Sequence, residues 1–251
     1  MRDVYLHVKK AGKGQPLVLL HGWGFDGSVW DSLSQLLSHD YELYQVDLPG
    51  FGLSDVMDFA MFKQCLLAQL PPQFMLIGWS MGGLFATRLA VEAPFRVTRL
   101  INVASSPCFL RAQNWPGVSL DVLTKFHQSL SSDPRGTLND FIHMQLHGLS
   151  ICERQNVIDR LGDLTQDSLQ VGLSIGLSIL SEWDLRADLY KLNLPVFYLF
   201  GRLDAITPYR TMAAMQRDYP HFTHQLIAGA AHVPFLSHID EFMLTLQEWL
   251  E

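Results

Sequence analysis

The chain has 251 residues, of which 48% are hydrophobic and 17% charged, and its formal net charge at pH 7 is −7. This composition excludes an intrinsically disordered chain, and the negative charge gives no support to nucleic acid as a partner. No apolar run approaches the roughly 20 residues of a membrane span, so we expect no membrane partner. The length suits one large α/β domain that carries an insertion.

Three cysteines are scattered along the chain without the spacing of metal ligands: Cys65, Cys108 and Cys152. An odd number of scattered cysteines favours a reducing compartment. Residues 1–10 alternate polar and apolar side chains and do not have the long apolar segment of a signal peptide. We therefore expect a cytoplasmic protein without a metal site.

The first half of the chain alternates strand patterns with helical patterns. We expect strands at residues 4–8, 17–20, 41–46, 74–77 and 100–103, with helices at 30–37, 62–70 and 81–93. Continuous apolar runs such as residues 17–20 are typical of strands that are covered on both faces. This alternation predicts an α/β fold with a mostly parallel sheet, right-handed crossovers and helices on both faces.

The strand pattern disappears between residues 108 and 184. Four helical patterns replace it, over residues 119–130, 134–146, 152–161 and 166–180. An all-helical block inserted in an α/β chain predicts a cap over the active edge of the sheet. We therefore expect residues 1–107 and 185–251 to form the core and residues 108–184 to form a helical cap.

The motif Gly78-Trp79-Ser80-Met81-Gly82 follows a buried apolar run and precedes a helical pattern. A Gly-x-Ser-x-Gly sequence between a strand and a helix is typical of the nucleophile elbow, a sharp turn that exposes a serine hydroxyl at the edge of a sheet. Glycine has no side chain to obstruct the approach of strand and helix. We interpret Ser80 as the candidate nucleophile.

Two polar residues follow the last two expected strands, at 195–200 and 223–227, before a final helix at 239–250. Asp204 follows the first of these strands and His232 the second. A serine hydroxyl needs a base to remove its proton, and the base needs a carboxylate to orient it. The order serine, aspartate, histidine along the chain is that of α/β-hydrolases. We expect Ser80, Asp204 and His232 to be catalytic.

A tetrahedral intermediate also needs hydrogen-bond donors for its oxyanion. The expected pair is the backbone N–H of Met81, directly after the nucleophile, and that of Trp23 in the glycine-rich loop at residues 21–24.

Other residues were weighed for the same roles. His21 precedes Ser80 in the chain and lies in a turn, so we interpret it as structural. Asp184 or Asp188 could orient His232, but neither directly follows a readable strand. Asp47 ends a strand, and its surroundings, rich in proline and glycine, favour a turn role.

The chain resembles α/β-hydrolases nearly end to end. Within the α/β-hydrolases, its motifs and one segment of the expected cap resemble the family of pimeloyl-[acyl-carrier protein] methyl ester esterases. The segments that carry this resemblance are Leu19-Leu20-His21-Gly22-Trp23, Asp47-Leu48-Pro49-Gly50-Phe51-Gly52, Gly78-Trp79-Ser80-Met81-Gly82-Gly83, Gly229-Ala230-Ala231-His232-Val233-Pro234-Phe235 and, in the cap, Phe141-Ile142-His143-Met144-Gln145.

The resemblance implies hydrolysis of the methyl ester on a pimeloyl chain carried by acyl carrier protein, with release of methanol, in biotin synthesis. It implies that no cofactor is needed and that acyl carrier protein is the partner; we expect a monomer. It also implies substrate contacts at Trp23, Met81, Phe141, Ile142, His143, Met144 and Gln145.

The family docks its acidic carrier through basic cap residues, for which Arg135, Arg154 and Arg160 are the candidates here. Asp140 and Glu153 interrupt the basic character of the same helices, so docking through another face stays open.

Alternatives to this function remain open at the level of the sequence. A broad short-chain carboxylesterase and a menaquinone-pathway lyase of the same fold are the enzyme alternatives. A ligand receptor with a hydrolase fold is the alternative from another class of protein. Turnover of a short-chain chromogenic ester would distinguish an enzyme from a receptor.

Overall fold

The computed structural model describes residues 4–146, 149–160 and 167–251. These residues form a seven-stranded sheet in the order β1-β3-β2-β4-β5-β6-β7. β1 pairs antiparallel with β3, and the other neighbours pair parallel, which confirms the mostly parallel sheet. The strands are β1 (Val8–Gly12), β2 (Gln15–Leu20), β3 (Tyr41–Val46), β4 (Phe74–Trp79), β5 (Val97–Val103), β6 (Val196–Gly201) and β7 (Thr223–Ile227).

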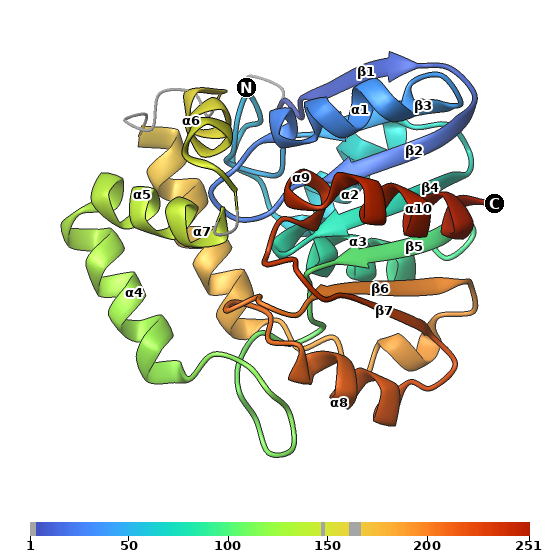
Figure 1. Ribbon diagram of the computed structural model, residues 1–251. Helices are drawn as coiled ribbons and strands as arrows, with labels where there is room; N and C mark the ends of the chain where they lie inside the picture. The colour runs from blue at the N-terminus through green and yellow to red at the C-terminus, as the bar shows by residue number, and fades with distance from the viewer. Residues whose placement is uncertain (1–3, 147–148, 161–166) are drawn as a thin grey trace.

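Helices cover both faces of this sheet. In Figure 1, α1, α9 and α10 lie in front of the strands, and α2 and α3 lie behind them. The helices of the α/β part are α1 (Asp31–Leu37), α2 (Phe59–Gln69), α3 (Met81–Glu92), α8 (Arg210–Asp218), α9 (Pro234–Ser237) and α10 (Ile239–Leu250), with short 3-10 turns at Gly27–Trp30 and Leu189–Lys191.

The four helices expected between residues 108 and 184 are present, with ends that differ by one or two residues from the expected ones. They are α4 (Leu120–Ser132), α5 (Pro134–Gln145), α6 (Ile151–Arg160) and α7 (Asp167–Glu182), and Figure 1 shows them together at one end of the sheet. α5 begins where the sequence indicates, because the Asp133 carboxylate accepts from the Gly136 N–H at 2.9 Å and Pro134 takes the first helical position. We propose that residues 108–184 act as a cap on the core formed by 1–107 and 185–251.

The strand expected at residues 4–8 is wrong, because β1 spans Val8–Gly12. The N–H of Tyr5 donates to the Asp55 carboxylate, the Asp55 N–H donates to the Tyr5 carbonyl, and the His7 N–H donates to Ser54 Oγ, at 2.9 Å each. Residues 4–7 are therefore extended but pair with a loop. β1 itself is an edge strand with exposed lysines, so it does not have the apolar pattern that would reveal it.

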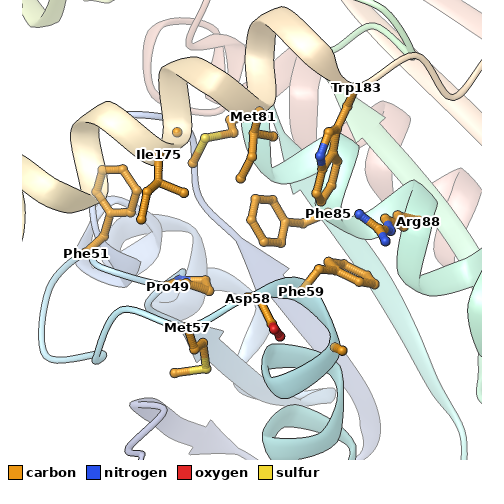
Figure 2. Close-up of a pocket in the computed structure, with 13 residues that line it drawn as sticks. Pro49, Phe51, Met57, Asp58, Phe59, Met81, Phe85, Arg88, Ile175 and Trp183 are labelled. Atoms are coloured by element: carbon orange, nitrogen blue, oxygen red, sulfur yellow. The ribbon is translucent and has the colours of Figure 1, made fainter.

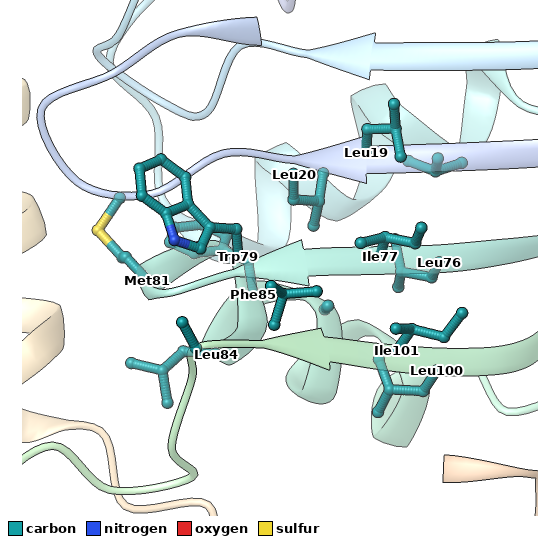
Figure 3. Packing of buried hydrophobic residues seen from close by; sticks show 14 of the residues in the cluster. Leu19, Leu20, Leu76, Ile77, Trp79, Met81, Leu84, Phe85, Leu100 and Ile101 are labelled. Carbon is teal, nitrogen blue, oxygen red and sulfur yellow. The ribbon is translucent and has the colours of Figure 1, made fainter. Parts of the chain in front are cut away.

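The core of the sheet is a row of apolar side chains on neighbouring parallel strands. Leu19 of β2 lies opposite Ile77 of β4, which lies opposite Ile101 of β5, as Figure 3 shows. All three are at most 1% exposed. These strands are buried on both faces, which explains why their sequences are continuous apolar runs rather than alternating ones.

α3 packs unusually close to β4 and β2 because two glycines remove the side chains between them. A Cβ on Gly78 would lie 2.5 Å from the Gly82 carbonyl oxygen, and a Cβ on Gly82 would lie 2.4 Å from the Leu20 carbonyl oxygen. The obstructing atoms are backbone atoms, so a side chain at either position would push the helix away from the sheet.

Gly78→Ala should therefore lower the free energy of unfolding by about 1–3 kcal/mol, the usual cost of overpacking. Urea denaturation measures this change, with Leu244→Ala on the exposed face of α10 as the surface control. Equal stability of the Gly78→Ala variant and the wild type would contradict the close packing described here.

Candidate active site

Ser80 occupies a strained turn between the end of β4 and the start of α3. Its backbone has φ 54° and ψ −120°, in a region that residues with a Cβ rarely adopt. Two hydrogen bonds hold this turn: the Ser80 N–H donates to the Val103 carbonyl at 2.9 Å, and the Ser105 hydroxyl donates to the Ser80 carbonyl at 2.7 Å. The turn thus places the serine side chain at the carboxyl edge of the sheet.

His232 and Asp204 reach the same edge from the loops that follow β7 and β6. Ser80 Oγ lies 2.9 Å from His232 Nε2, and Asp204 Oδ2 lies 2.7 Å from His232 Nδ1. The three residues are 4%, 1% and 5% exposed, respectively. Segments separated by more than a hundred residues are therefore joined in one hydrogen-bonded line of serine, histidine and aspartate.

The Asp204 carboxylate is fixed on both of its oxygens. Oδ1 accepts from the N–H groups of Ile206 and Thr207 at 2.8 Å each, while Oδ2 faces His232. Because a carboxylate only accepts, the imidazole carries its proton on Nδ1, and Nε2 is left to accept from the Ser80 hydroxyl. Trp79 adds a further constraint, since its indole N–H donates to the His232 carbonyl at 2.8 Å.

Of the two residues whose backbone N–H groups are expected in an oxyanion hole, Met81 directly follows Ser80, and Trp23 lines the same cavity as Ser80. Met81 is the first residue of α3, where N–H groups have no partner within the helix. Within the described part of the chain, the N–H groups of Trp23 and Met81 donate to no acceptor. We propose that they bind the oxyanion.

The Trp23 side chain is anchored in the cap. Its indole N–H donates to the Leu173 carbonyl of α7 at 2.9 Å, and its ring meets Phe141 of α5 edge-on at 4.9 Å between centroids. Gln145 of α5 also reaches this loop, with its Nε2 at 3.5 Å from the Trp23 carbonyl. The cap and the expected oxyanion loop are thus held against each other.

A cavity of about 360 Å³ opens next to Ser80 between the core and the cap. Its walls are largely apolar. Its lining residues are Trp23, Ser80, Phe109, Arg111, Gly117, Val118, Ser119, Val122, Leu123, Phe126, Phe141, Met144, Leu177, Leu180, Ala205, Ile206 and Pro208. A cavity of this size that is mostly apolar suits the hydrocarbon chain of a small ester.

The cap segment at residues 141–145 is divided between cavity, core and surface. Phe141 and Met144 line the cavity, Ile142 and Gln145 are buried at 1% and 0% exposure, and His143 is exposed. Substrate contact at each of these residues stays a prediction. Helical geometry explains the division, because five consecutive positions point in different directions around α5.

A second cavity of about 400 Å³ lies between α2, α3 and α7. Figure 2 shows Phe51, Met81, Phe85, Ile175 and Trp183 around it. Leu177 and Leu180 of α7 line the first cavity, whereas Ile175, Gly176 and Ile179 line this one. Met81, adjacent to Ser80, directs its side chain into the second cavity (Figure 2).

His21 is a structural residue, as the sequence indicates. Its Nδ1 lies 2.8 Å from the Gly22 carbonyl, and its Nε2 accepts from the Leu48 N–H at 2.9 Å. Both ring nitrogens are therefore occupied in the neutral form. Burial lowers the pKa of His21 below its ordinary value of 6.5, against the nearby charge of Asp47, which raises it.

The aspartates that were weighed against Asp204 have other partners. Asp47 accepts from the N–H groups of Gly27 and Leu53 at 2.8 Å each and so closes its turn. Asp184 forms an ion pair with Arg186 at 2.5 Å, and Asp188 pairs with Lys191 at 2.6 Å. The structure thus gives the contact with His232 to Asp204.

Some supporting residues were not singled out from the sequence. The Ser105 hydroxyl donates to the Ser80 carbonyl. The Thr207 hydroxyl, in the loop after β6, donates to the Ala104 carbonyl at 3.0 Å and so holds that loop against the end of β5. Small hydroxyl residues in loops have no distinguishing pattern. Trp79 was visible within the elbow motif, but its bond to His232 depends on tertiary structure.

Among the described residues, no group of three or more His, Cys, Asp or Glu side chains is placed to hold a metal ion. The search for a membrane-spanning helix, made over the same part of the chain, found none that is long and apolar enough.

A serine on a strand-to-helix elbow, with histidine and aspartate on the loops after later strands, is the arrangement typical of the α/β-hydrolase class. The comparison with protein families agrees, because residues 17–243 match the alpha/beta hydrolase family. The chain belongs to this family.

The names of similar proteins describe a more specific activity than the family does. A pimeloyl-[acyl-carrier protein] methyl ester esterase of Legionella pneumophila (strain Corby) is 47% identical over 246 residues, which cover 98% of this chain and 99% of the relative. The protein of that name from Serratia marcescens is 39% identical over 250 residues, 98% of each chain. Among solved structures, an esterase from Exiguobacterium antarcticum has a TM-score of 0.88 at 23% identity, covering 97% of this chain and 94% of its own.

The lowered pKa of His21 predicts a pH-dependent loss of stability. The unfolded chain binds a proton at its ordinary pKa near 6.5, whereas the folded chain binds it only at lower pH. The stability is therefore complete above pH 6.5 and declines as the pH falls toward the folded pKa, by up to about 1.4 kcal/mol per pH unit for one proton.

Urea denaturation between pH 7.5 and pH 5 should show a smaller decline for His21→Gln, which has no titrating ring at this position, than for the wild type. Parallel declines in the two proteins would refute this role of His21.

Proposed function

We propose that this protein is a serine carboxylesterase that hydrolyses the methyl ester of pimeloyl-acyl-carrier protein and releases methanol, a step of biotin synthesis. The hydrogen-bonded line of Ser80, His232 and Asp204 beside an apolar cavity carries the proposal of esterase chemistry. Relatives named for this reaction, at 39–47% identity over nearly the whole chain, support the substrate.

The first half of the proposed reaction forms an acyl-enzyme. His232 Nε2 removes the proton of the Ser80 hydroxyl as the oxygen attacks the ester carbonyl. The N–H groups of Trp23 and Met81 stabilise the oxyanion, where loss of one donor costs about 3–4 kcal/mol in comparable enzymes. Asp204 stabilises the imidazolium, which then protonates the departing methanol.

The second half regenerates the serine. His232 removes a proton from a water molecule that attacks the acyl-enzyme and passes it to Ser80 as the pimeloyl chain leaves with a free carboxylic acid. The acid then loses its proton to bulk water, and no other residue has to supply or accept a proton. The proposed reaction therefore needs only the residues of this chain and water.

The apolar wall of the catalytic cavity suits the methylene chain of the pimeloyl group. Phe126 and Phe141 pack at 5.2 Å between ring centroids, and Met144, 45% exposed, adds a flexible thioether at the wall. We propose that the acyl chain runs from Ser80 along these residues and leaves the cavity toward the carrier.

The proposal that the carrier docks on the cap concerns three arginines. Arg135 is exposed near the start of α5, whereas Arg154 is half-buried and donates to the Leu149 carbonyl at 3.1 Å. The side chain of Arg160 lies outside the described part of the chain. We propose that Arg135 and Arg154 steer the acidic carrier, with Arg160 as a further candidate.

We also propose that the protein acts as a monomer in the cytoplasm. Ser80, Asp204 and His232 all belong to one chain, so no second copy is needed to complete the site. Its cysteines, Cys65, Cys108 and Cys152, are free, as in a reducing compartment.

Ser80→Ala should reduce kcat for pimeloyl-carrier methyl ester by about 10⁴-fold or more, as removal of the nucleophile does in other serine hydrolases. Methanol release measures the rate, and an unchanged midpoint of thermal unfolding serves as the control for folding. A rate equal to that of the wild type would end the serine-esterase proposal. Rates for a panel of free short-chain esters would separate this function from that of a broad carboxylesterase.

If the cap arginines steer the carrier, Arg135→Glu and Arg154→Glu should each raise KM for the carrier-linked ester about fivefold, with kcat nearly unchanged. The effect should shrink at high salt, because screening weakens exposed charge pairs. Lys13→Glu is the matched control, since Lys13 precedes β2 at the opposite edge of the sheet. Equal effects of all three variants would reject docking through the cap.

A further inference from the structure

Arg111 is the only charged residue among the described residues that line the catalytic cavity. The rest of the lining is apolar or small, apart from the hydroxyl groups of Ser80 and Ser119. Ser80 is the nucleophile of the proposed reaction, and the Ser119 hydroxyl accepts from the Val122 N–H at the start of α4. The Arg111 guanidinium is therefore a polar group of this cavity that takes part neither in the proposed reaction nor in capping α4.

The guanidinium is not neutralised by a neighbour. Its Nε donates to the Gly117 carbonyl at 3.3 Å, and no carboxylate of the described chain lies within ion-pair distance. The two arginines that contact this loop are paired: Arg186 with Asp184, and Arg217 with Asp218. Arg111 thus keeps its two terminal nitrogen groups available for an acceptor from a ligand.

The loop that carries Arg111 is held in place by several contacts. The Arg111 N–H donates to the Val118 carbonyl at 2.9 Å, and Ala112 and Trp115 form an isolated antiparallel bridge. The Trp115 indole N–H donates to the Cys108 carbonyl at 2.9 Å, and the Arg186 guanidinium lies 5.3 Å from the centre of the Trp115 ring. Arg217 donates to the Asn114 carbonyl at 3.2 Å. A loop fixed in this way can present Arg111 at low entropic cost.

The first turn of α4 is also close, since Ser119 and Val122 line the same cavity. Asp121 lies in that turn and offsets the partial positive charge of the helix start. The guanidinium of Arg111 is therefore the group on which recognition of an anion depends.

We infer that Arg111 forms an oxyanion-binding subsite in the catalytic cavity and that the enzyme favours esters whose far end is anionic. The ester carbonyl lies at Ser80, the apolar chain contacts the cavity wall, and an anionic oxygen pair meets the planar fork of Arg111. This inference rests on the proposed esterase function. It adds a group that selects substrates by charge.

Two sources could supply such an oxyanion. One is the free carboxylate of a dicarboxylic acid half-ester, and the other is the phosphodiester of the phosphopantetheine arm of an acyl carrier. Both present a pair of oxygens to the same fork, so they share one chemistry. Two pairs of test substrates separate them.

The first pair is monomethyl pimelate and neutral dimethyl pimelate. The second pair is the methyl pimeloyl thioester of 4′-phosphopantetheine and that of pantetheine, which has no phosphate. In the wild type, we expect kcat/KM to be about tenfold higher for the anionic member of at least one pair, through a lower KM. The pair that shows the preference identifies the source of the oxyanion.

The variants test the role of Arg111 itself. Arg111→Gln should reduce the preference to near one, and Arg111→Lys, which keeps the charge but not the fork, should retain part of it. Lys13→Gln removes the same charge from the opposite edge of the sheet and should leave the preference unchanged. Thermal unfolding of each variant tests whether the fold is intact.

The inference is overturned if neither pair shows a preference, if the preference survives in Arg111→Gln, or if Lys13→Gln abolishes it as well. A different result would reject the proposed function. If the wild type does not hydrolyse the neutral pantetheine thioester, the proposed function is wrong, whatever preference the enzyme shows between charged and neutral free esters.

Discussion

The structure depends on the close contact between β4 and α3, which only glycine permits. Gly78 and Gly82 let the helix start directly behind the strand, and the turn between them forces Ser80 to φ 54°. This strained turn directs the hydroxyl away from the sheet, toward the loops that follow β6 and β7. The bonds from Ser105 and to Val103 keep it there, so the packing energy of the core maintains a backbone conformation that is unfavourable by itself.

In the proposed site, the proposed cap supplies much of the cavity wall, whereas Ser80, His232 and Asp204 come from the core. Trp23 links the two parts, since its backbone belongs to the core loop and its indole is bonded to Leu173 of the cap. α7 lines both cavities with different residues, so a change in its position would alter both. Arg111 lies in the segment that leads from β5 into α4, where loops can vary without disturbing the sheet. The proposed chemistry and the proposed selection of substrates thus belong to different parts of the chain.

Local patterns revealed the elements that are buried or amphipathic. The runs that became β2, β4 and β6 are continuous apolar segments, and the cap helices repeat apolar residues at helical spacing, so both could be predicted. β1 could not, because its exposed lysines give an edge strand no apolar pattern, while residues 4–7 alternate and yet pair with Asp55 and Ser54 of a loop. The neighbouring residues Phe141 and Ile142 show the same limit, since one lines the cavity and the other is buried in the core.

The sequence by itself determined most of the strands and helices, though not β1, α8 or α9, and it determined the elbow at Ser80 and the candidates Asp204 and His232, because each depends on residues adjacent in the chain. Only the tertiary structure decided that these side chains meet within hydrogen-bond distance, that Asp184 and Asp188 have other partners, and that Arg111 lines the cavity with no acidic partner among the described residues. The physical reason is that the crossovers of a parallel sheet bring together segments more than a hundred residues apart. The distances between such segments are set by packing, which no local pattern records.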